Sequence, residues 1–351
     1  MNVEEALEQS RENVQKVIEI CRRPGRMLIL MQDNPDPDAL ACAAALREFA
    51  FHHAKKRADI GYGGVCGRAE NRAMMDVLHI HAKRLSAAQI SPYRIIALVD
   101  AQPNTGNNLL LKKRVPNIVI DHHLMPKRAK WTTEFADVRP EYGAACTILY
   151  EYLTVSGVKI NRNLATALFY GMQSDTQDLG REASIPGMHA YQELFIRADK
   201  KKLARIRRAP VPAAYFNMLA VSLSECVIAG KTVISHIPEC DNAEMIAEVA
   251  DLLLRLEGVR STVCYGLCDG KIYISARAVD LRDNMARRMK QAVRMIGTGG
   301  GHRAMAGGQV LVNGDAEKRM ALVRERLLKA FARGKEARPL LPQPQPEEAV
   351  Q

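Results

Sequence analysis

Three short apolar runs, each followed at once by polar residues, limit the possible folds of this chain more than any other feature. The runs Arg26–Met31, Arg94–Val99 and Asn117–Ile120 have the composition of buried strands. Helices are expected between them, clearest over residues 3–22 and Ala39–His53. This alternation predicts an α/β fold with a doubly wound, mostly parallel sheet. Ligands bind such sheets beyond the carboxyl ends of the strands, so the polar residues there are candidates for function.

A basic stretch and a proline-rich break divide the chain. Residues 197–208 carry seven basic residues and one acid, a net charge of +6, and Pro210 and Pro212 follow. After the break, strand-like and helical segments in the order ββαββα predict a smaller α+β domain. The predicted organisation is a first domain over 1–196, a basic linker over 197–214, a second domain over 215–334 and a disordered Pro-rich tail over 335–351.

Charge and composition exclude several classes of protein. The chain of 351 residues has 50 Lys and Arg against 39 Asp and Glu, so its net charge is +11. The clustered positive charge favours an anionic partner, although a solvated helix face explains it equally well. No apolar run approaches the length of a membrane span and no secretory signal is evident, so we expect a cytoplasmic protein with no membrane partner. The eight cysteines include no Cys-x-x-Cys pair, which argues against disulfides and a zinc site.

Acidic residues and histidines gather where the predicted strands end. Asp36 and Asp38 follow the first run, Asp100 the second and Asp121–His123 the third, and Asp175 follows a helix expected to end near residue 171. Any one of these aspartates could be an ordinary helix cap or turn residue. Together they supply oxygen and imidazole ligands without sulfur, a set that suits Mn²⁺ or a similar divalent ion. A carboxylate in such a set can bridge two ions.

These motifs, with Gln32–Asp38 at the start and Gly299–His302 near the end, resemble the ordered motifs of the DHH phosphoesterase family with its associated C-terminal domain. The closest resemblance is to the nanoRNase and 3′-phosphoadenosine-5′-phosphate phosphatase group, which shares its core with RecJ-type exonucleases. The similarity runs from about Met27 to about Val312. It implies an active site in the cleft between the two domains.

The resemblance implies a hydrolase with two Mn²⁺ ions, or other divalent ions, in which Asp100 bridges. Asp36 and Asp100 would hold the first ion, and Asp38, Asp100, His122 and Asp175 the second. The implied catalytic residues are Asp100, His123 and His302, with Asp121 behind the histidines. The implied substrate-binding residues are Arg277, Gly299, Gly300, Gly301, His302 and Arg303, which form an anion-binding loop and the arginine that accompanies it.

One position departs from the family pattern. The opening motif of the family has a metal-binding histidine four residues before its first aspartate, and this chain has Gln32 there. An amide oxygen is a weaker ligand than imidazole for a manganese-like ion, so the first ion is expected to be weakly held, differently coordinated or absent. Asp33 could compensate for the change. Gln32 is kept as a candidate ligand, because every other ligand of the implied set is retained.

The expected function is hydrolysis of phosphoester bonds in short RNA or DNA fragments, or in small nucleotides, by metal-activated water. One alternative is a phosphodiesterase acting on linear or cyclic diadenylate. Another is a nucleic-acid or nucleotide binding protein whose catalysis is impaired by Gln32. A manganese pyrophosphatase is disfavoured, because the second domain brings a separate anion loop that pyrophosphate does not need. The oligomeric state stays open, with a homodimer among the expectations.

Overall fold

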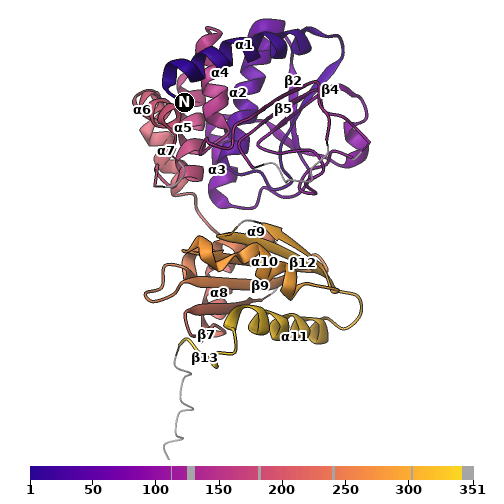
Figure 1. Cartoon of the computed structure of the whole chain (residues 1–351), viewed down its shortest axis with the longest axis vertical. Coiled ribbons are helices and arrows are strands. Elements are labelled where there is room, and N and C mark those ends of the chain that lie inside the picture. The colour runs from indigo at the N-terminus through magenta and orange to yellow at the C-terminus, as the bar shows by residue number, and fades with distance from the viewer. Residues whose placement is uncertain (112, 125–130, 181–182, 239–241, 302, 342–351) are drawn as a thin grey trace, which may run out of the picture. The chain divides into compact units, whose positions relative to one another are not determined.

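The computed structural model describes the chain except for residues 112, 125–130, 181–182, 239–241, 302 and 342–351. The chain forms two compact units, residues 1–210 and residues 211–351 (Figure 1). Within the described residues, no helix combines the length and the apolar character that crossing a bilayer requires.

The first unit contains a parallel sheet and a set of helices. Its described strands are β1 (Arg26–Leu30), β2 (Ala58–Tyr62), β3 (Ala82–Arg84), β4 (Tyr93–Val99), β5 (Ile118–Asp121) and β6 (Phe135–Val138). Its described helices are α1 (Val3–Arg22), α2 (Pro37–Ala54), α3 (Ala69–Leu78), α4 (Cys146–Val155), α5 (Arg162–Thr176), α6 (Ile185–Arg197) and α7 (Lys200–Arg207). Local sequence sets several helix starts. The Asn2 side chain caps α1, and Asp36 caps α2, whose first residue is Pro37.

The strands of the first unit follow the order β3-β2-β1-β4-β5-β6, and every pair is parallel. The direction of winding changes between β1 and β4, and the predicted α/β fold with a mostly parallel sheet is confirmed. Alternate residues of β1 point to opposite faces: Met27 and Ile29 pack against the helices, which gather on one side of the sheet (Figure 1), while Leu28 and Leu30 face the other side. On that second face the described connections are loops and the short helix at Ala87–Ile90.

Helix α5 packs closely against α2, and a glycine permits this approach. A Cβ atom on Gly171 would lie 3.1 Å from the Ala41 Cβ, the Cys146 Sγ and the Pro37 carbonyl oxygen. The helix then continues for more than a turn past Gly171 and ends at Thr176. The sequence had predicted that Asp175 follows this helix, whereas it lies in the last turn. The longer helix carries the Asp175 carboxylate toward the end of the sheet.

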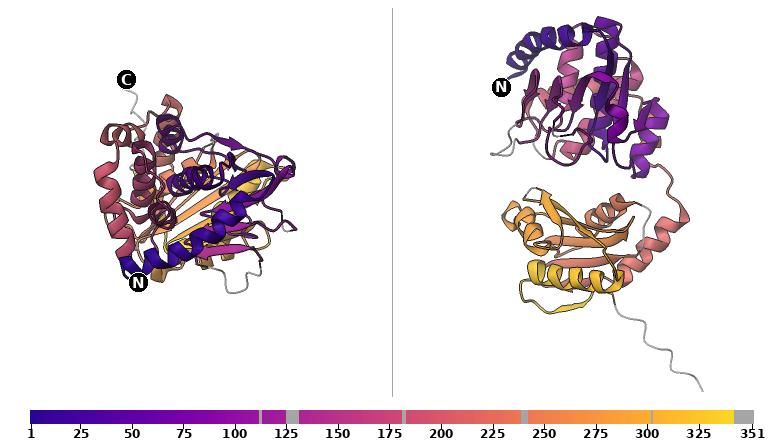
Figure 2. Two further views of the ribbon diagram at one scale, coloured as in Figure 1. Left: turned by 90° about the horizontal axis from the view of Figure 1, so that it is seen from above. Right: turned by 90° about the vertical axis from the view of Figure 1, so that its right-hand side faces the viewer.

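The second unit is the predicted α+β domain. Its described strands are β7 (Val227–Ala229), β8 (Thr232–Ile237), β9 (Ser261–Cys268), β10 (Lys271–Ala278), β11 (Thr298–Gly301), β12 (Met305–Leu311) and β13 (Ala337–Pro339). Its described helices are α8 (Ala213–Ser224), α9 (Ala243–Leu253), α10 (Met285–Ala292) and α11 (Ala316–Leu327). The described strands form one sheet in the order β11-β12-β10-β9-β8-β7-β13, and neighbouring strands are antiparallel except β8 and β9. Helices α10 and α11, the latter yellow in Figure 2, share one core with the sheet, and α8 and α9 share another.

Three segments differ from their predicted form. The stretch predicted as a basic linker contains α7, whose buried Leu203 and Ile206 join the core of the first unit. The glycines predicted as a loop form strand β11, which pairs with β12. Glycine is needed in this strand, because a Cβ on Gly299 would lie 2.9 Å from atoms of Met289 and Val293. The start of the predicted tail pairs with β7 as strand β13.

The contact between α2 and α5 predicts the effect of Gly171→Ala. Alanine in place of glycine normally stabilises an exposed helix by roughly 0.5–1 kcal/mol. Here the added methyl group would lie 3.1 Å from three buried atoms, one of them a backbone oxygen, which would have to shift. We therefore expect a loss of about 1–3 kcal/mol of unfolding free energy. Urea unfolding of both proteins measures the difference. A stabilised variant would contradict the packing described here.

Candidate metal centre

The polar side chains of the predicted site lie where three neighbouring strands end. Strand β1 pairs with β4 so that Leu30 lies opposite Leu98, and β4 pairs with β5 so that Val99 lies opposite Ile120. The next residues along the three strands are therefore neighbours at the carboxyl end of the sheet. This end includes the point between β1 and β4 where the winding of the sheet changes direction, which is the usual ligand position in such folds.

Asp38 is held in place by the main chain of another helix. Its carboxylate oxygens accept hydrogen bonds from the N–H groups of Ala145, at 2.6 Å, and Cys146, at 2.9 Å. Helix α4 begins here and has no side-chain cap of its own. The carboxylate is 1% exposed and receives the favourable end of the α4 dipole. Asp36, in contrast, caps its own helix by accepting from the Ala39 N–H at 2.9 Å.

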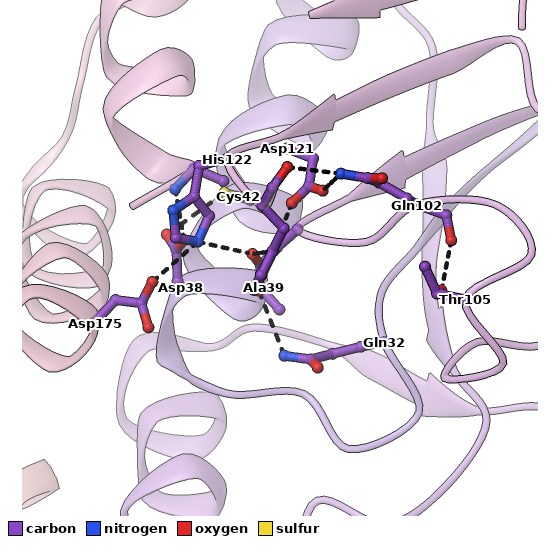
Figure 3. A network of polar contacts seen from close by, with 12 residues as sticks. Gln32, Asp38, Ala39, Cys42, Gln102, Thr105, Asp121, His122 and Asp175 are labelled. Carbon is purple, nitrogen blue, oxygen red and sulfur yellow. Dashed lines mark hydrogen bonds and ion pairs between the residues drawn. The ribbon is translucent and has the colours of Figure 1, made fainter. Parts of the chain in front are cut away.

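The imidazole of His122 faces three carboxylates. Its Nδ1 lies 3.0 Å from the carbonyl oxygen of Tyr142 and donates a hydrogen bond to it, which leaves Nε2 as the atom that can bind a metal. The distances from Nε2 are 3.1 Å to Asp175 Oδ2, 3.6 Å to Asp100 Oδ1 and 4.0 Å to Asp38 Oδ2. Figure 3 shows Asp38 and Asp175 on the same side of the His122 ring. Despite these approaches, Nε2 is buried and has no hydrogen bond of proper geometry.

Asp100 carries another buried atom that lacks a hydrogen-bond partner. Its Oδ1 makes no hydrogen bond and lies 3.6 Å from His122 Nε2 and 3.5 Å from His123 Nδ1. The backbone of Asp100 is left-handed, with φ of 50°, while its N–H donates to the Ile120 carbonyl at 2.9 Å. Buried polar atoms are nearly always hydrogen-bonded, so an unsatisfied oxygen that faces an unsatisfied nitrogen fits a cation-binding site. The residues present therefore fit a divalent metal.

His123 is oriented by its neighbours. Its Nδ1 lies 2.9 Å from Asp121 Oδ1, and the other oxygen of Asp121 accepts a hydrogen bond from Gln102 Nε2 at 2.7 Å. Gln102 also donates to the His123 carbonyl at 2.8 Å, and Figure 3 shows its amide directed at Asp121. The His123 side chain is 43% exposed. It can therefore reach a ligand from solvent while Asp121 fixes its ring.

Crowded negative charge perturbs these groups strongly. Burial, and then repulsion by Asp175 and Asp38, raises the pKa of Asp36 to about 7. Burial and the neighbouring carboxylates also raise the pKa values of Asp38 and Asp100. Although burial opposes it, contact with Asp175 and Asp38 raises the pKa of His122 to about 10. Without a cation the cluster retains protons, and a divalent ion would supply the compensating charge.

Gln32 contacts the site as a hydrogen-bond donor. Its Nε2 donates to Asp36 Oδ2 at 2.9 Å and to Asp100 Oδ2 at 3.4 Å. Among the described residues, two groups have ligand atoms close enough to hold one ion: Asp100 with His122 and His123, and Asp38 with His122 and Asp175. Neither group includes Asp36 or Gln32. The amide therefore bridges two of the carboxylates that were predicted to hold the first ion.

The substrate-binding residues predicted by resemblance lie in the second unit. Arg277 is the last residue but one of β10, and its guanidinium donates to Asp251 Oδ1 at 2.6 Å and to Ser275 Oγ at 2.8 Å. Gly299–Gly301 belong to β11, and Arg303 is exposed in the turn before β12. His302 lies outside the described residues. The role of these residues in substrate binding stays a prediction.

Several groups that build the site were not predicted. Gln102 follows a strand just as Asp100 does, so its polar side chain was a signal that could have been used. The Tyr142 carbonyl and the N–H groups of Ala145 and Cys146 are main-chain atoms, and no residue type marks them in a sequence.

The raised pKa values predict how pH changes the stability of the metal-free protein. Between about pH 4 and pH 7 the folded carboxylates bind more protons than the unfolded ones, and His122 extends this excess to higher pH. The unfolding free energy should therefore fall as pH rises from about 5 to about 8. Thermal unfolding with a chelator, and again with excess Mn²⁺, measures this. Mn²⁺ should reduce the loss, and a metal-free protein that becomes more stable over this range would contradict the prediction.

The contacts of Gln32 predict that Gln32→His tightens the first ion. In the wild type the ion beside Gln32 lacks an imidazole ligand, so it should bind as the second and weaker equivalent of Mn²⁺. In Gln32→His the imidazole supplies that ligand, and the two affinities should become more similar. Titration calorimetry measures both affinities, and Gln32→Ala controls for simple loss of the amide. Two equally tight ions in the wild type, unchanged in Gln32→His, would mean that Gln32 or Asp33 already serves as a ligand.

The sequence of this chain is similar to a known family and to one curated protein. Residues 26–172 match the sequence model described as the DHH family, N-terminal domain. An uncharacterized protein of Methanocaldococcus jannaschii is 36% identical over 287 residues, which are 81% of this chain and 58% of that protein. The chain thus spans less than two thirds of the length of this relative.

An exopolyphosphatase-related protein of known structure shows a similar fold at low sequence identity. An exopolyphosphatase-related protein from Bacteroides fragilis has a TM-score of 0.65 with 15% identity, covering 92% of this chain and 96% of that one. RecJ from Thermus thermophilus, solved with Mn²⁺, has a TM-score of 0.48 with 14% identity, covering 92% of this chain and 54% of its own. The family match covers the strands and loops that carry Asp36, Asp38, Asp100 and His122. Residues 26–172, which lie in the first unit, are therefore similar to the N-terminal domain of the DHH family.

Proposed function

We propose that this chain is a metal-dependent phosphoesterase that hydrolyses short oligonucleotides or small nucleotides. The observation that carries the proposal is the pair of buried atoms without hydrogen bonds, Asp100 Oδ1 and His122 Nε2, 3.6 Å apart among further carboxylates. What distinguishes this pair from other buried polar atoms without hydrogen bonds is that the oxygen and the nitrogen face each other within a cluster of carboxylates. The similarity of residues 26–172 to the DHH family supports the same reaction class.

The residues that would hold metal divide into two sets. Asp38, Asp100, His122 and Asp175 would hold one divalent ion, and Asp36 with Asp100 would hold another. When bound, such ions lower the pKa of a water molecule and neutralise the charge that develops on phosphoryl oxygens. Manganese is our proposal for the ion, because the ligands are carboxylates and one imidazole without a thiolate.

The chain's own groups then orient substrate and transfer protons. Asp121 holds His123 by Nδ1, so this half-exposed imidazole can approach a phosphate oxygen or a leaving group in a fixed orientation. The Tyr142 carbonyl keeps the His122 lone pair on Nε2, directed at the carboxylates. The dipole of α4 keeps the Asp38 carboxylate in place.

The substrate class is proposed from charge. Helix α7 and its flanks present Lys201, Arg205, Arg207 and Arg208 at the surface of the first unit, which suits a polyanion such as a nucleic-acid strand. An exopolyphosphatase-related relative in structure supports polyanions in general without distinguishing nucleotides from polyphosphate. A panel of a dinucleotide, 3′-phosphoadenosine-5′-phosphate, cyclic diadenylate and pyrophosphate, each with Mn²⁺, separates the nanoRNase-like function from its alternatives.

A second candidate function is binding without hydrolysis. The observation that favours it is Gln32, whose amide occupies the space between Asp36 and Asp100. Tight binding of a dinucleotide with no product after long incubation in Mn²⁺ would support this candidate. Turnover of any member of the panel would exclude it.

Asp100→Asn tests the proposed chemistry. Asparagine tolerates the left-handed backbone at this position, so the fold should persist, but an amide cannot bridge two cations as a carboxylate does. We expect hydrolysis to fall by at least about a hundredfold. The measurement is release of mononucleotide from a labelled dinucleotide, with circular dichroism to verify folding. Asp269→Asn, an exposed substitution at another residue with a left-handed backbone, is the control and should retain full activity. Near wild-type turnover in Asp100→Asn would remove Asp100 from the metal centre.

A further inference from the structure

One short segment, residues 139–146, supports two of the proposed metal ligands through its main chain. The Tyr142 carbonyl accepts from His122 Nδ1 at 3.0 Å, and the N–H groups of Ala145 and Cys146 donate to Asp38. The position of this segment therefore sets both the ring orientation of His122 and the place of the Asp38 carboxylate. Whatever fixes the segment also fixes the ligands.

The segment begins at Arg139, whose side chain is 2% exposed. Its guanidinium uses all five N–H donors, and the bonds are Nε to Asp137 Oδ1 at 2.8 Å, Nη2 to Asp137 Oδ2 at 2.7 Å, Nη2 to Ser10 Oγ at 2.9 Å, Nη1 to Glu151 Oε2 at 2.7 Å and Nη1 to the Tyr142 hydroxyl at 3.0 Å. These partners come from α1, β6, α4 and the segment itself. The Arg139 N–H also donates to the carbonyl of Asp121, the residue before His122, at 3.0 Å.

Tyr142 is fixed at both its main chain and its side chain. Its N–H donates to the Arg139 carbonyl at 3.0 Å, which closes a turn. Its hydroxyl donates to Glu151 Oε1 at 2.7 Å and accepts from Arg139. The carbonyl that orients His122 therefore belongs to a residue anchored from two directions.

We propose that Arg139 and Tyr142 are positioning residues of the metal centre: their buried ionic network holds residues 139–146 so that His122 and Asp38 point at one cation. Buried ion pairs rarely add stability over an apolar core, because desolvation offsets their attraction. They do impose a single geometry, since each bond has a fixed direction. The proposal rests on the metal centre proposed above, and its first test needs no metal.

Two tyrosines of the network offer a matched comparison. Tyr142 and Tyr152 each donate a hydroxyl hydrogen bond to a carboxylate that also pairs with Arg139: Glu151 for Tyr142, and Asp137, at 2.8 Å, for Tyr152. Only Tyr142 belongs to the segment that supports the ligands. Tyr142→Phe and Tyr152→Phe therefore remove the same group from the same network, at one position that orients the ligands and one that does not.

The first measurement follows the His122 Nδ1–H in the metal-free protein by ¹⁵N-edited NMR. In the wild type and in Tyr152→Phe this proton should exchange slowly, because it is bonded to the Tyr142 carbonyl. In Tyr142→Phe it should exchange faster or disappear. The second measurement is Mn²⁺ affinity by calorimetry, where we expect a loss of about tenfold in Tyr142→Phe and less than about twofold in Tyr152→Phe.

Thermal unfolding of both variants separates positioning from stability. Comparable losses in Tm with unequal Mn²⁺ affinities support the proposal. Equal effects of both variants on Nδ1–H exchange and on Mn²⁺ affinity would overturn it, as would an unchanged Tyr142→Phe. If Tyr142→Phe does not fold, Glu151→Gln takes its place in the comparison with Tyr152→Phe, with the same expectations. This variant keeps the Tyr142 hydroxyl but removes the charge of the carboxylate to which the hydroxyl donates. A wild type that binds no Mn²⁺ would defeat the proposed function, whereas the NMR comparison would still decide the positioning role.

Discussion

Repulsion among buried carboxylates is the interaction on which the rest of the first unit depends. Asp38 and Asp100 are almost fully buried at the end of the sheet, beside the half-buried Asp36 and Asp175. Like charges at this distance favour protonation or a bound cation. The surrounding structure acts on the same problem: the α4 N–H groups and the imidazole of His122 provide positive ends, and Gln32 provides an amide donor. What they leave unsatisfied, at Asp100 Oδ1 and His122 Nε2, indicates where a cation belongs.

The orientation of the side chains in the candidate metal centre depends on residues that lie far from it. The side chains that face the proposed cation come from strand ends, but their orientations come from elements further away. Gly171 lets α5 approach α2 and bring Asp175 to the site, and the Arg139 network connects α1, β6 and α4 to the turn beneath His122. Rigid elements therefore set the geometry, as a site that must hold a strongly charged ion requires.

Local patterns predicted the parts of the fold and site that are themselves local. Apolar runs followed by Asp36, Asp100 and His122 predicted both the parallel sheet and the edge where these residues meet, because strand and ligand lie within a few residues of each other. Strands β2, β3 and β6 were not predicted, since sequences such as that of β3, Ala82–Arg84, are short and polar. The glycines of β11 suggested a loop because glycine disfavours strands, and only the packing of Met289 and Val293 explains them. The support from the Tyr142 carbonyl could not be predicted, because every residue has a carbonyl.

The most direct test of this account is the position of a bound cation. Crystals grown with Mn²⁺ and measured at the manganese absorption edge give an anomalous peak at each ion. The account predicts a strong peak bounded by Asp38, His122 and Asp175, with Asp100 also in contact, and a weaker peak or none beside Gln32. Strong peaks only outside this cluster, or an His122 ring turned away from the carboxylates in the metal-bound protein, would contradict it.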